Sequence, residues 1–368
     1  MKPFFKYSGG KRKEAPTVEK YMPKEFDKFY EPFLGAGAIW LHLQHSENVV
    51  NDNFPDVMNF FRVLKRDTEK LVGEINKLSS EYSKEISAVK KNVKLEKELG
   101  KEQNNLAKIY ASENSSIKKA TAILAAMKPN EEGRMCSRHS AETLSEVAET
   151  LASREQKIKD SKTLIKDMKE RLNKDVNQIA DKYYYHYRDN TFTDDYDQAL
   201  SFYLMRQLSF SGMLRFSSEG KFNIPYGWYK SFKGIDQPID DIKKILNNTT
   251  FMQGDWKECV KNATKDDFVF LDPPYTRVFT DYHPAGQFGP AQQIELADWF
   301  KSTKAKTMII LNRDEFTEDL YKDYIVDDYD FRYSVQYRDR MTEKDSNAKH
   351  FVAINNYTPA SLSGQSSE

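Results

Sequence analysis

The sequence has 368 residues, which is enough for one large domain and a second unit. It carries 56 Lys and Arg against 56 Asp and Glu, so the formal net charge is +0 and a global basic field that would attract polyanions is excluded. Any nucleic-acid binding must therefore rest on local patches. A hydrophobic content of 39% with a mean hydropathy of −0.76 indicates one very polar segment beside an ordinary globular core.

The two cysteines, Cys136 and Cys259, provide no disulfide framework and fit a reducing compartment. The first residues are charged, and the sequence has no apolar run long enough for a signal peptide or a membrane span. We therefore expect a soluble, intracellular protein without membrane association.

The amino-terminal segment, residues 3–13, places Gly9 and Gly10 before three consecutive cations, Lys11, Arg12 and Lys13. Such a segment forms a positively charged backbone concavity suited to a carboxylate or phosphate. The alternative is a flexible basic terminus.

A strand at residues 26–30, a glycine turn at 35–38 and a helix at 39–43 open a Rossmann-like unit. A second short strand at 48–50 leads to Asp52, which falls roughly twenty residues beyond the turn, where such folds place an acid on ribose hydroxyls. This part of the sequence predicts a site for a cofactor that contains a nucleoside.

A long polar segment follows, with no proline between Asp56 and Lys128. Apolar residues spaced by threes and fours predict a long amphipathic helix on each side of a breaker at 129–133: Leu71, Ile75, Leu78, Tyr82, Ile86, Val89 and Val93 before it, and Leu144, Val147, Leu151, Ile158, Ile165, Met168, Leu172, Val176 and Ile179 after it. We expect an antiparallel, coiled-coil-like helical hairpin whose first arm breaks near 100–105 or 112–116. Its charges are mixed in sign, which favours a solvated outer face over a nucleic-acid groove.

Cys136 and His139 lie near the breaker. One cysteine and one histidine do not make a metal site, so we expect a loop with incidental residues.

The aromatic segment 183–188 returns the chain to the globular part, and a helix at about 194–207 leads to a glycine-punctuated loop at 210–227. Exposed aromatic, Arg, Lys and Asn side chains would supply wedges, phosphate contacts and base-edge contacts to DNA. A packed β-hairpin with a turn at Glu219-Gly220 is the alternative. The predicted DNA-binding residues are Phe210, Ser211, Arg215, Lys221 and Asn223.

The segment 251–256 predicts a strand with a polar tip that includes Asp255, and four bulky apolar residues at 268–271 predict a strand buried on both faces of a sheet. That strand ends in Asp272-Pro273-Pro274-Tyr275, at the sheet edge where ligands of α/β proteins bind. The Asp272 carboxylate and a proline carbonyl would accept both hydrogens of an exocyclic amine, and Tyr275 would stack on the base. A plain turn is the alternative.

The rest of the chain completes an α/β pattern. We expect a loop at 281–290 that closes over a ligand, a helix at 292–301, a strand at 307–312, a final strand pair near 331–335 and 350–355, and a disordered Ser-rich tail at 358–368.

Four motifs occur in a fixed order: residues 6–11 (KYSGGK), 31–37 (EPFLGAG), the loop 215–227 with its FNIPYG stretch at 222–227, and 272–275 (DPPY). Together they resemble the Dam-like family of adenine-specific DNA methyltransferases of bacteria and phages, over roughly residues 3–62 and 200–357. The resemblance implies methyl transfer from S-adenosylmethionine to the N6 amine of an adenine flipped out of double-stranded DNA, without a metal. It also implies a cytoplasmic location, in a bacterial cell or a phage-infected host.

The resemblance assigns catalysis to Asp272, Pro273, Pro274 and Tyr275. It assigns the cofactor site to Tyr7, Lys11, Glu31, Pro32, Phe33, Gly35, Gly37, Asp52, Asp255 and Asp272. Two departures matter. Tyr7 stands where the family usually has Trp, so an aromatic ring is retained at this position. Residues 210–213 (FSGM) replace the YNGL with which the family reads DNA, so the target sequence stays open.

The predicted fold is a Rossmann-like, S-adenosylmethionine-dependent α/β core with an inserted helical hairpin and a small target-recognition region. The predicted parts are 1–65 (cofactor), 66–182 (hairpin), 183–250 (target recognition), 251–357 (catalysis) and 358–368 (tail). The hairpin has no counterpart in the resemblance, and we expect it to form a homodimer, clamp DNA or bind another protein.

Two alternatives to adenine methylation stay open at this point. One is a catalytically degenerate, DNA-binding scaffold that uses the hairpin to recruit a partner. The other is methylation of the cytosine amino group or of RNA by the same pocket.

Overall fold

The computed structural model describes residues 1–7, 9–126, 138–217, 219–275, 288–332 and 347–362. It divides into two compact units, unit 1 (Met1–Glu81 and Lys182–Glu368) and unit 2 (Tyr82–Asp181). No helix in the described part of the chain is both long enough and apolar enough to cross a membrane.

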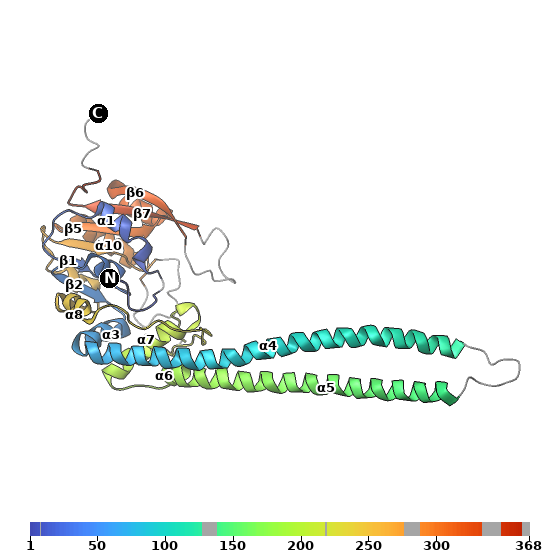
Figure 1. Ribbon diagram of the computed structural model, residues 1–368. Helices are drawn as coiled ribbons and strands as arrows, with labels where there is room; N and C mark the ends of the chain where they lie inside the picture. Colours follow the sequence, from blue (N-terminus) through green and yellow to red (C-terminus); the bar gives the residue numbers. More distant parts are fainter. Residues whose placement is uncertain (8, 127–137, 218, 276–287, 333–346, 363–368) are drawn as a thin grey trace. The chain divides into compact units, whose positions relative to one another are not determined.

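Unit 1 contains all the strands of the described residues and most of the helices (Figure 1). The strands are β1 (Phe29–Glu31), β2 (Asn48–Asp52), β3 (Thr249–Gln253), β4 (Phe268–Leu271), β5 (Lys306–Asn312), β6 (Ile325–Arg332) and β7 (Asn347–Asn355). The helices are η1 (Lys11–Lys13), α1 (Ala15–Tyr21), α2 (Ala38–Leu43), α3 (Pro55–Arg66), the start of α4 (Thr68–Ala126), α6 (His186–Asp189), α7 (Asp195–Leu208), η3 (Phe210–Gly212), α8 (Ile239–Asn247), α9 (Trp256–Val260), α10 (Pro290–Ser302), α11 (Glu315–Tyr321) and η4 (Lys322–Tyr324).

The seven strands form one sheet in the order β3-β2-β1-β4-β5-β7-β6. The pairs from β3 to β5 are parallel, and β7 is antiparallel to both β5 and β6. Strand order reverses between β1 and β4, so the carboxyl ends of these two strands flank a topological switch point, where open α/β sheets bind ligands. The predicted Rossmann-like α/β core is confirmed.

Strand β4 is buried along its whole length, as its unbroken apolar sequence predicts. Successive side chains of a strand point to opposite faces. Val269 and Leu271 therefore pack with α9, α10 and α11 in one core, whose buried members include Trp256, Leu296, Phe300 and Tyr321. Phe268, on the opposite face, packs against Phe26 and Phe29.

A second aromatic core joins α2, α3 and α7. The Trp40 ring meets Phe61 and Phe251 edge-on at centroid distances of 5.4 and 5.6 Å, and Phe5 packs edge-on against Phe202 at 5.1 Å. Offset and edge-on aromatic pairs add stability beyond their buried area. Through Phe5, this core fixes the amino-terminal segment against α7.

Unit 2 contains the rest of α4 and α5 (Arg138–Ala180), which run side by side (Figure 1). Gln103 Nε2 donates to the Ser161 carbonyl at 3.4 Å between them. The predicted break in the first arm is wrong, because α4 is continuous from Thr68 to Ala126 and includes Gly100. A single glycine costs a helix only about 1 kcal/mol relative to alanine, which the remaining turns absorb.

Other boundaries also differ from those predicted. The first strand begins at Phe29 and not at residue 26. Strand β6 occupies 325–332 and not 331–335, because it is an edge strand whose charged sequence, IVDDYDFR, lacks the apolar pattern of a buried strand. A π-helical segment, η2 (Asp181–Tyr185), occupies the predicted aromatic return. The breaker at 129–133, Cys136, most of the loop at 281–290 and the end of the tail lie outside the described residues.

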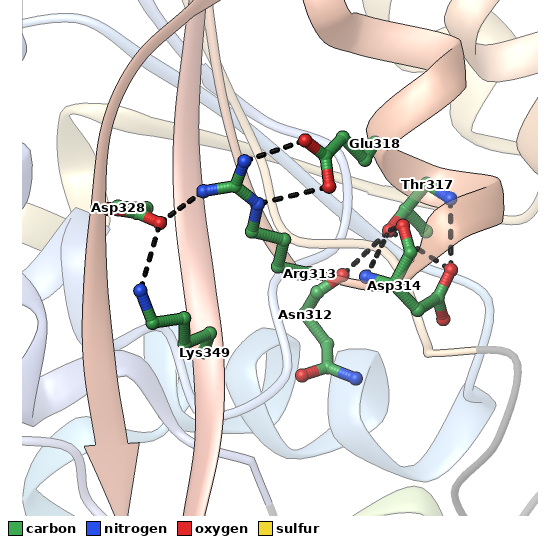
Figure 2. A network of polar contacts seen from close by, with 7 residues as sticks. All are labelled: Asn312, Arg313, Asp314, Thr317, Glu318, Asp328 and Lys349. Atoms are coloured by element: carbon green, nitrogen blue, oxygen red, sulfur yellow. Dashed lines mark hydrogen bonds and ion pairs between the residues drawn. The ribbon is translucent and has the colours of Figure 1, made fainter.

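A polar network holds the far edge of the sheet beyond β5 (Figure 2). Arg313 makes a bidentate pair with Glu318 at 2.6 and 3.1 Å and also pairs with Asp328, which in turn accepts from Lys349 at 3.3 Å. Asp314 caps α11 by accepting from the Thr317 N–H at 2.9 Å. These contacts tie β5, α11, β6 and β7 together, which fixes the register of the antiparallel pair.

Candidate active site

Three acidic side chains meet at the carboxyl edge of the sheet. Glu31 ends β1, Asp52 ends β2, and Asp272 follows β4. Since β1 lies between β2 and β4, parallel pairing brings the three to one place. The sequence prediction that Asp52 and Asp272 share a site is consistent with this placement.

The glycine turn after β1 is shaped around Asp52. Gly35 has a φ of 51° and donates its N–H to Asp52 Oδ2 at 2.7 Å, while Asp52 Oδ1 accepts from the Phe54 N–H at 2.9 Å. A Cβ at Gly35 would lie 3.0 Å from Tyr7 Cε1, and one at Gly37, with a φ of 66°, would lie 2.7 Å from Trp40 Cε3. Both positions therefore need glycine. Burial raises the pKa of Asp52, and these backbone donors oppose the rise.

Glu31 is 3% exposed, and its Oε2 accepts from the Trp40 N–H at 2.8 Å. Burial raises the pKa of Glu31 well above its usual range, and the charges of Asp272 and Asp52 add to the rise. Glu31 therefore holds the start of α2, and its raised pKa favours the neutral form of the carboxyl group.

The other predicted cofactor residues lie around this edge. The Pro32 carbonyl accepts from Asn51 Nδ2 at 3.1 Å, and the Phe33 ring packs edge-on against Phe288 at 5.4 Å. Asp255 caps α9, where its Oδ1 accepts from the Lys257 N–H at 3.0 Å. Helix capping accounts for Asp255 without a ligand.

Lys11 is buried, with 4% of its surface exposed, so the alternative of a flexible basic terminus is wrong for this residue. Its Nζ lies 3.2 Å from Asp272 Oδ1 and 3.1 Å from Glu14 Oε2, and it donates to the Tyr275 hydroxyl. These partners raise the pKa of Lys11 well above its usual range although burial opposes them. Lys11 is therefore a fixed cation beside Asp272.

The pKa of Asp272 is set by burial and by the charges of its neighbours. Its side chain is 20% exposed. Burial raises the pKa of Asp272 to about 6, Lys11 opposes the rise, and the Glu14 charge adds to it. The group is an ionised acceptor at neutral pH that becomes protonated in mild acid.

The Pro-Pro-Tyr turn is braced from α10. Gln293 is 1% exposed, and its Nε2 donates to the Pro274 carbonyl at 2.9 Å. The Tyr275 ring packs edge-on against His350 at 5.7 Å, and Lys11 Nζ lies 4.9 Å from the ring centroid. The turn is thus held from two sides, at the Pro274 carbonyl and at the Tyr275 ring.

All five predicted DNA-binding residues are exposed: Phe210, Ser211, Arg215, Lys221 and Asn223. Arg215 Nε donates to Asn223 Oδ1 at 2.8 Å across a narrow hairpin closed by the Phe216 to Phe222 bridge. The hairpin alternative is therefore correct for the backbone, and its outer face carries the predicted polar residues. In the part of the chain that the structure describes, the Lys221 ammonium group forms an ion pair with the exposed Glu219 carboxylate, at 3.4 Å.

The segment that precedes the glycines is joined to this hairpin region. Arg206 of α7 is fully buried, donates from Nε to the Lys6 carbonyl at 2.8 Å and lies 5.4 Å from the Tyr7 ring centroid. Lys6 Nζ lies over the Tyr229 ring at 4.1 Å. The predicted cofactor and DNA segments are thus neighbours in unit 1.

Sequence reasoning missed several residues near the site. Glu14 contacts Lys11 from three residues further along the chain, and Tyr329 and His350 contact Glu14. Only tertiary contacts reveal the last two. Trp228 is 61% exposed at a φ of 57°, and its position directly after the FNIPYG motif was the one available signal.

Comparison with protein-family models matches residues 7–124 and 142–341 to the D12 class N6 adenine-specific DNA methyltransferase family. This match runs through most of both long helices, so it does not mark them as an insertion. Residues 70–195 also match the helical domain of nucleotidyl transferase L544.

Curated relatives are similar over most of their lengths. A type II methyltransferase, M1.LlaDCHI of Lactococcus lactis subsp. cremoris, is 26% identical over 88% of this chain and 86% of its own. The type II methyltransferase M.CviBI of Paramecium bursaria Chlorella virus NC1A is 25% identical over 97% of this chain and 100% of its own. The DNA adenine methylase of Haemophilus influenzae is 22% identical over 87% of this chain and 82% of its own.

Proposed function

The chain belongs to the D12 class N6 adenine-specific DNA methyltransferase family, and on that premise we propose that it transfers a methyl group from S-adenosylmethionine to N6 of an adenine flipped out of double-stranded DNA. The single observation that carries the residue assignment is the position of Asp272 at the switch point, beside Lys11 and the glycine turn that Asp52 holds.

The chemistry of this edge fits S-adenosylmethionine. The bound cofactor supplies an electrophilic methyl group on a sulfonium centre. Asp52 and Asp272 are carboxylates whose ionised forms are opposed by burial, so a cationic ligand beside them would be favoured. Asp52 would bind the ribose hydroxyls. Gly35 makes room for the Tyr7 ring, which would contact the adenine of the cofactor.

The target amine is a poor nucleophile because its lone pair is delocalised into the adenine ring. Asp272 and the Pro273 carbonyl would accept its two hydrogens, which favours tetrahedral geometry at nitrogen and directs the lone pair toward the methyl carbon. The bound cofactor would supply the methyl group and keep the electron pair of the broken C–S bond as a neutral thioether, and the methylated amine would then release one N6 proton to solvent. Lys11 holds the Asp272 carboxylate in place.

The test of this function is transfer of labelled methyl groups to duplex DNA, followed by digestion to nucleosides and mass spectrometry. The proposal requires label in N6-methyl-2′-deoxyadenosine. Label in N4-methylcytosine, or transfer to RNA alone, would support the alternative acceptors instead.

The pH dependence follows from the charge that Asp272 needs. Because burial raises the pKa of Asp272 to about 6, its acceptor form is complete well above pH 6 and is lost as the pH falls through 6. We expect log kcat/KM for methylation to fall with a slope of one below about pH 6. Initial rates between pH 5 and 8 would measure this, and a flat profile down to pH 5 would contradict it.

We assign DNA binding to the exposed face of 210–227, with Phe210 as a wedge and Arg215, Lys221 and Asn223 as polar contacts. Trp228 extends this face. The Phe210 N–H donates to the Pro225 carbonyl at 2.9 Å, and the Trp228 ring lies 5.3 Å from that of Tyr226, so two exposed aromatic rings lie on adjacent segments.

Trp228 offers an optical test of this interface. It is the most exposed of the four tryptophans, since Trp40 and Trp256 are buried and Trp299 is half-buried. Stacking on bases should quench its fluorescence, so duplex DNA is expected to reduce tryptophan emission in the wild type but not in Trp228→Phe. Equal quenching in both proteins would place the contact elsewhere.

We propose that unit 2, which contains most of α4 and α5, binds a second copy of the chain or another protein. The support is the periodic apolar stripe, of which Ile158, Ile165 and Met168 are half-buried in unit 2. Its charged residues are of mixed sign, which disfavours the alternative of a DNA clamp.

A further inference from the structure

A buried chain of polar contacts continues behind Lys11, away from the proposed substrate. Glu14 is 2% exposed and uses both of its carboxylate oxygens. Its Oε2 lies 3.1 Å from Lys11 Nζ, while Oε1 lies 2.8 Å from His350 Nδ1 and accepts from the Tyr329 hydroxyl. Glu14 therefore connects Lys11 to two strands of the sheet.

The two strands supply these donors in register. Tyr329 of β6 pairs directly with His350 of β7. Adjacent residues Asp328 and Lys349 point to the opposite face, where they belong to the Arg313 network (Figure 2). His350 is fully buried and stacks on Phe331 at 4.6 Å. The donors to Glu14 are thus fixed by the sheet, and the Glu14 carboxylate has little freedom to move.

Lys11 lies between two carboxylates at nearly equal distances, 3.1 Å to Glu14 and 3.2 Å to Asp272. A lysine with one anionic partner would move fully onto it, whereas the second anion shares the ammonium group and leaves Asp272 only partly neutralised. The place of Lys11, and with it the basicity of Asp272, depends on Glu14.

We propose that Glu14 is a positioning residue for methyl transfer: held by His350 and Tyr329, it shares Lys11 with Asp272 and thereby sets both the place and the proton affinity of the Asp272 carboxylate. The inference rests on the proposed function, because Asp272 is the group that would meet the amine.

Several charged or titratable groups face this cluster. Asp272 is faced by Lys11 and Glu14 from the amino-terminal segment, by Glu31 of β1, by Tyr7 and by Tyr275 of its own turn. Glu14 is faced by Lys11, His350 and Tyr329, and these donors lower its pKa to about 2 against the effect of burial. Burial lowers the pKa of His350, so it donates to Glu14 as a neutral ring near neutral pH.

The test is Glu14→Gln in the full-length chain. Loss of the Glu14 charge removes a contribution that raises the pKa of Asp272, so the acid limb of the rate profile should move below pH 6. The plateau kcat should fall about tenfold as Lys11 shifts, with KM for DNA unchanged. The matched control is Glu19→Gln, an exposed acid of α1 that pairs with His42 and should leave both quantities unchanged.

Carbon-13 NMR of the aspartate carboxyls, with Asp272→Asn used for assignment, follows the same titration without turnover. A lower Asp272 midpoint in Glu14→Gln supports the inference. A folded Glu14→Gln protein with the wild-type midpoint and wild-type rates overturns it. A wild-type chain that titrates as expected but methylates no DNA contradicts the proposed function and not the positioning role.

Tyr329→Phe keeps the proposal testable if Glu14→Gln fails to fold. It retains the ring and removes one donor to Glu14, so kcat should fall about threefold while the acid limb stays in place, because the Glu14 charge remains. Unchanged kcat in a folded Tyr329→Phe protein would overturn the proposed support of Glu14.

Discussion

Replacement of Asp272 by Asn is expected to lower kcat for DNA methylation about a thousandfold while the protein stays folded. The variant keeps the shape of the side chain but replaces the carboxylate by a neutral amide. The carboxylate is the proposed acceptor for the amine, and its Oδ1 lies 3.2 Å from Lys11 Nζ. Loss of one preorganised electrostatic contact in an active site typically costs about 10²–10³ in kcat, and here Lys11 also loses an anion. Single-turnover rates with labelled cofactor would measure the loss.

Asp266 provides the matched control, because it is an exposed acid just before the same strand, β4. Asp266→Asn should retain wild-type rates. Near-wild-type activity in Asp272→Asn would remove Asp272 from the reaction. If neither the wild type nor the variant transferred methyl groups, the degenerate-scaffold alternative would be favoured, and calorimetry with S-adenosylmethionine would then distinguish a cofactor-binding core from an empty one.

Replacement of Asp52 by Ala should weaken S-adenosylmethionine binding roughly 30- to 150-fold. The carboxylate holds the Gly35 N–H at 2.7 Å and is the proposed partner of the ribose hydroxyls. A hydrogen bond to a charged group contributes about 1.5–3 kcal/mol, and the expected weakening corresponds to about 2–3 kcal/mol, the upper part of the range for one such bond. Isothermal titration calorimetry would measure the dissociation constant.

Asp27 lies before β1, at the opposite end of the sheet, and is exposed. Asp27→Ala is therefore the control and should bind the cofactor like the wild type. DNA binding without cofactor should be equal in the wild type and both variants, since Asp52 lies at the end of β2 beside the glycine turn and not on the exposed face of 210–227. Unchanged cofactor affinity in Asp52→Ala would remove this residue from the proposed site.

The catalytic turn and the glycine turn were predictable because their signals are local. An unbroken apolar strand that ends at Asp272-Pro273, and an acid a fixed distance beyond Gly35, report directly on strand ends in a parallel sheet. The sheet then brings these ends together without further information from the sequence.

The surroundings of Lys11 were not predictable in the same way. Its burial depends on Glu14, which is local, but also on Asp272 and Tyr275, which lie more than 250 residues away in the sequence. Glu14 in turn depends on His350 and on Tyr329, which sits in an edge strand rich in aspartate that does not resemble a strand. Long-range pairing of polar groups leaves no periodic pattern.

The predicted break in the first long helix was wrong for a different reason. Gly100 and the Ser- and Asn-containing stretch at 112–116 carry weak helix propensities, yet α4 continues through both. Propensity differences below about 1 kcal/mol per residue are overridden by the cooperativity of a long helix.

The most direct test of the account is sequencing that detects modified adenine in DNA from cells that lack adenine methylation and express either the wild-type chain or Asp272→Asn. We predict N6-methyladenine at a defined sequence in the wild-type sample and its absence in the variant sample. Methylation of cytosine alone, or no modified base in cells that contain the folded wild-type protein, would contradict the account.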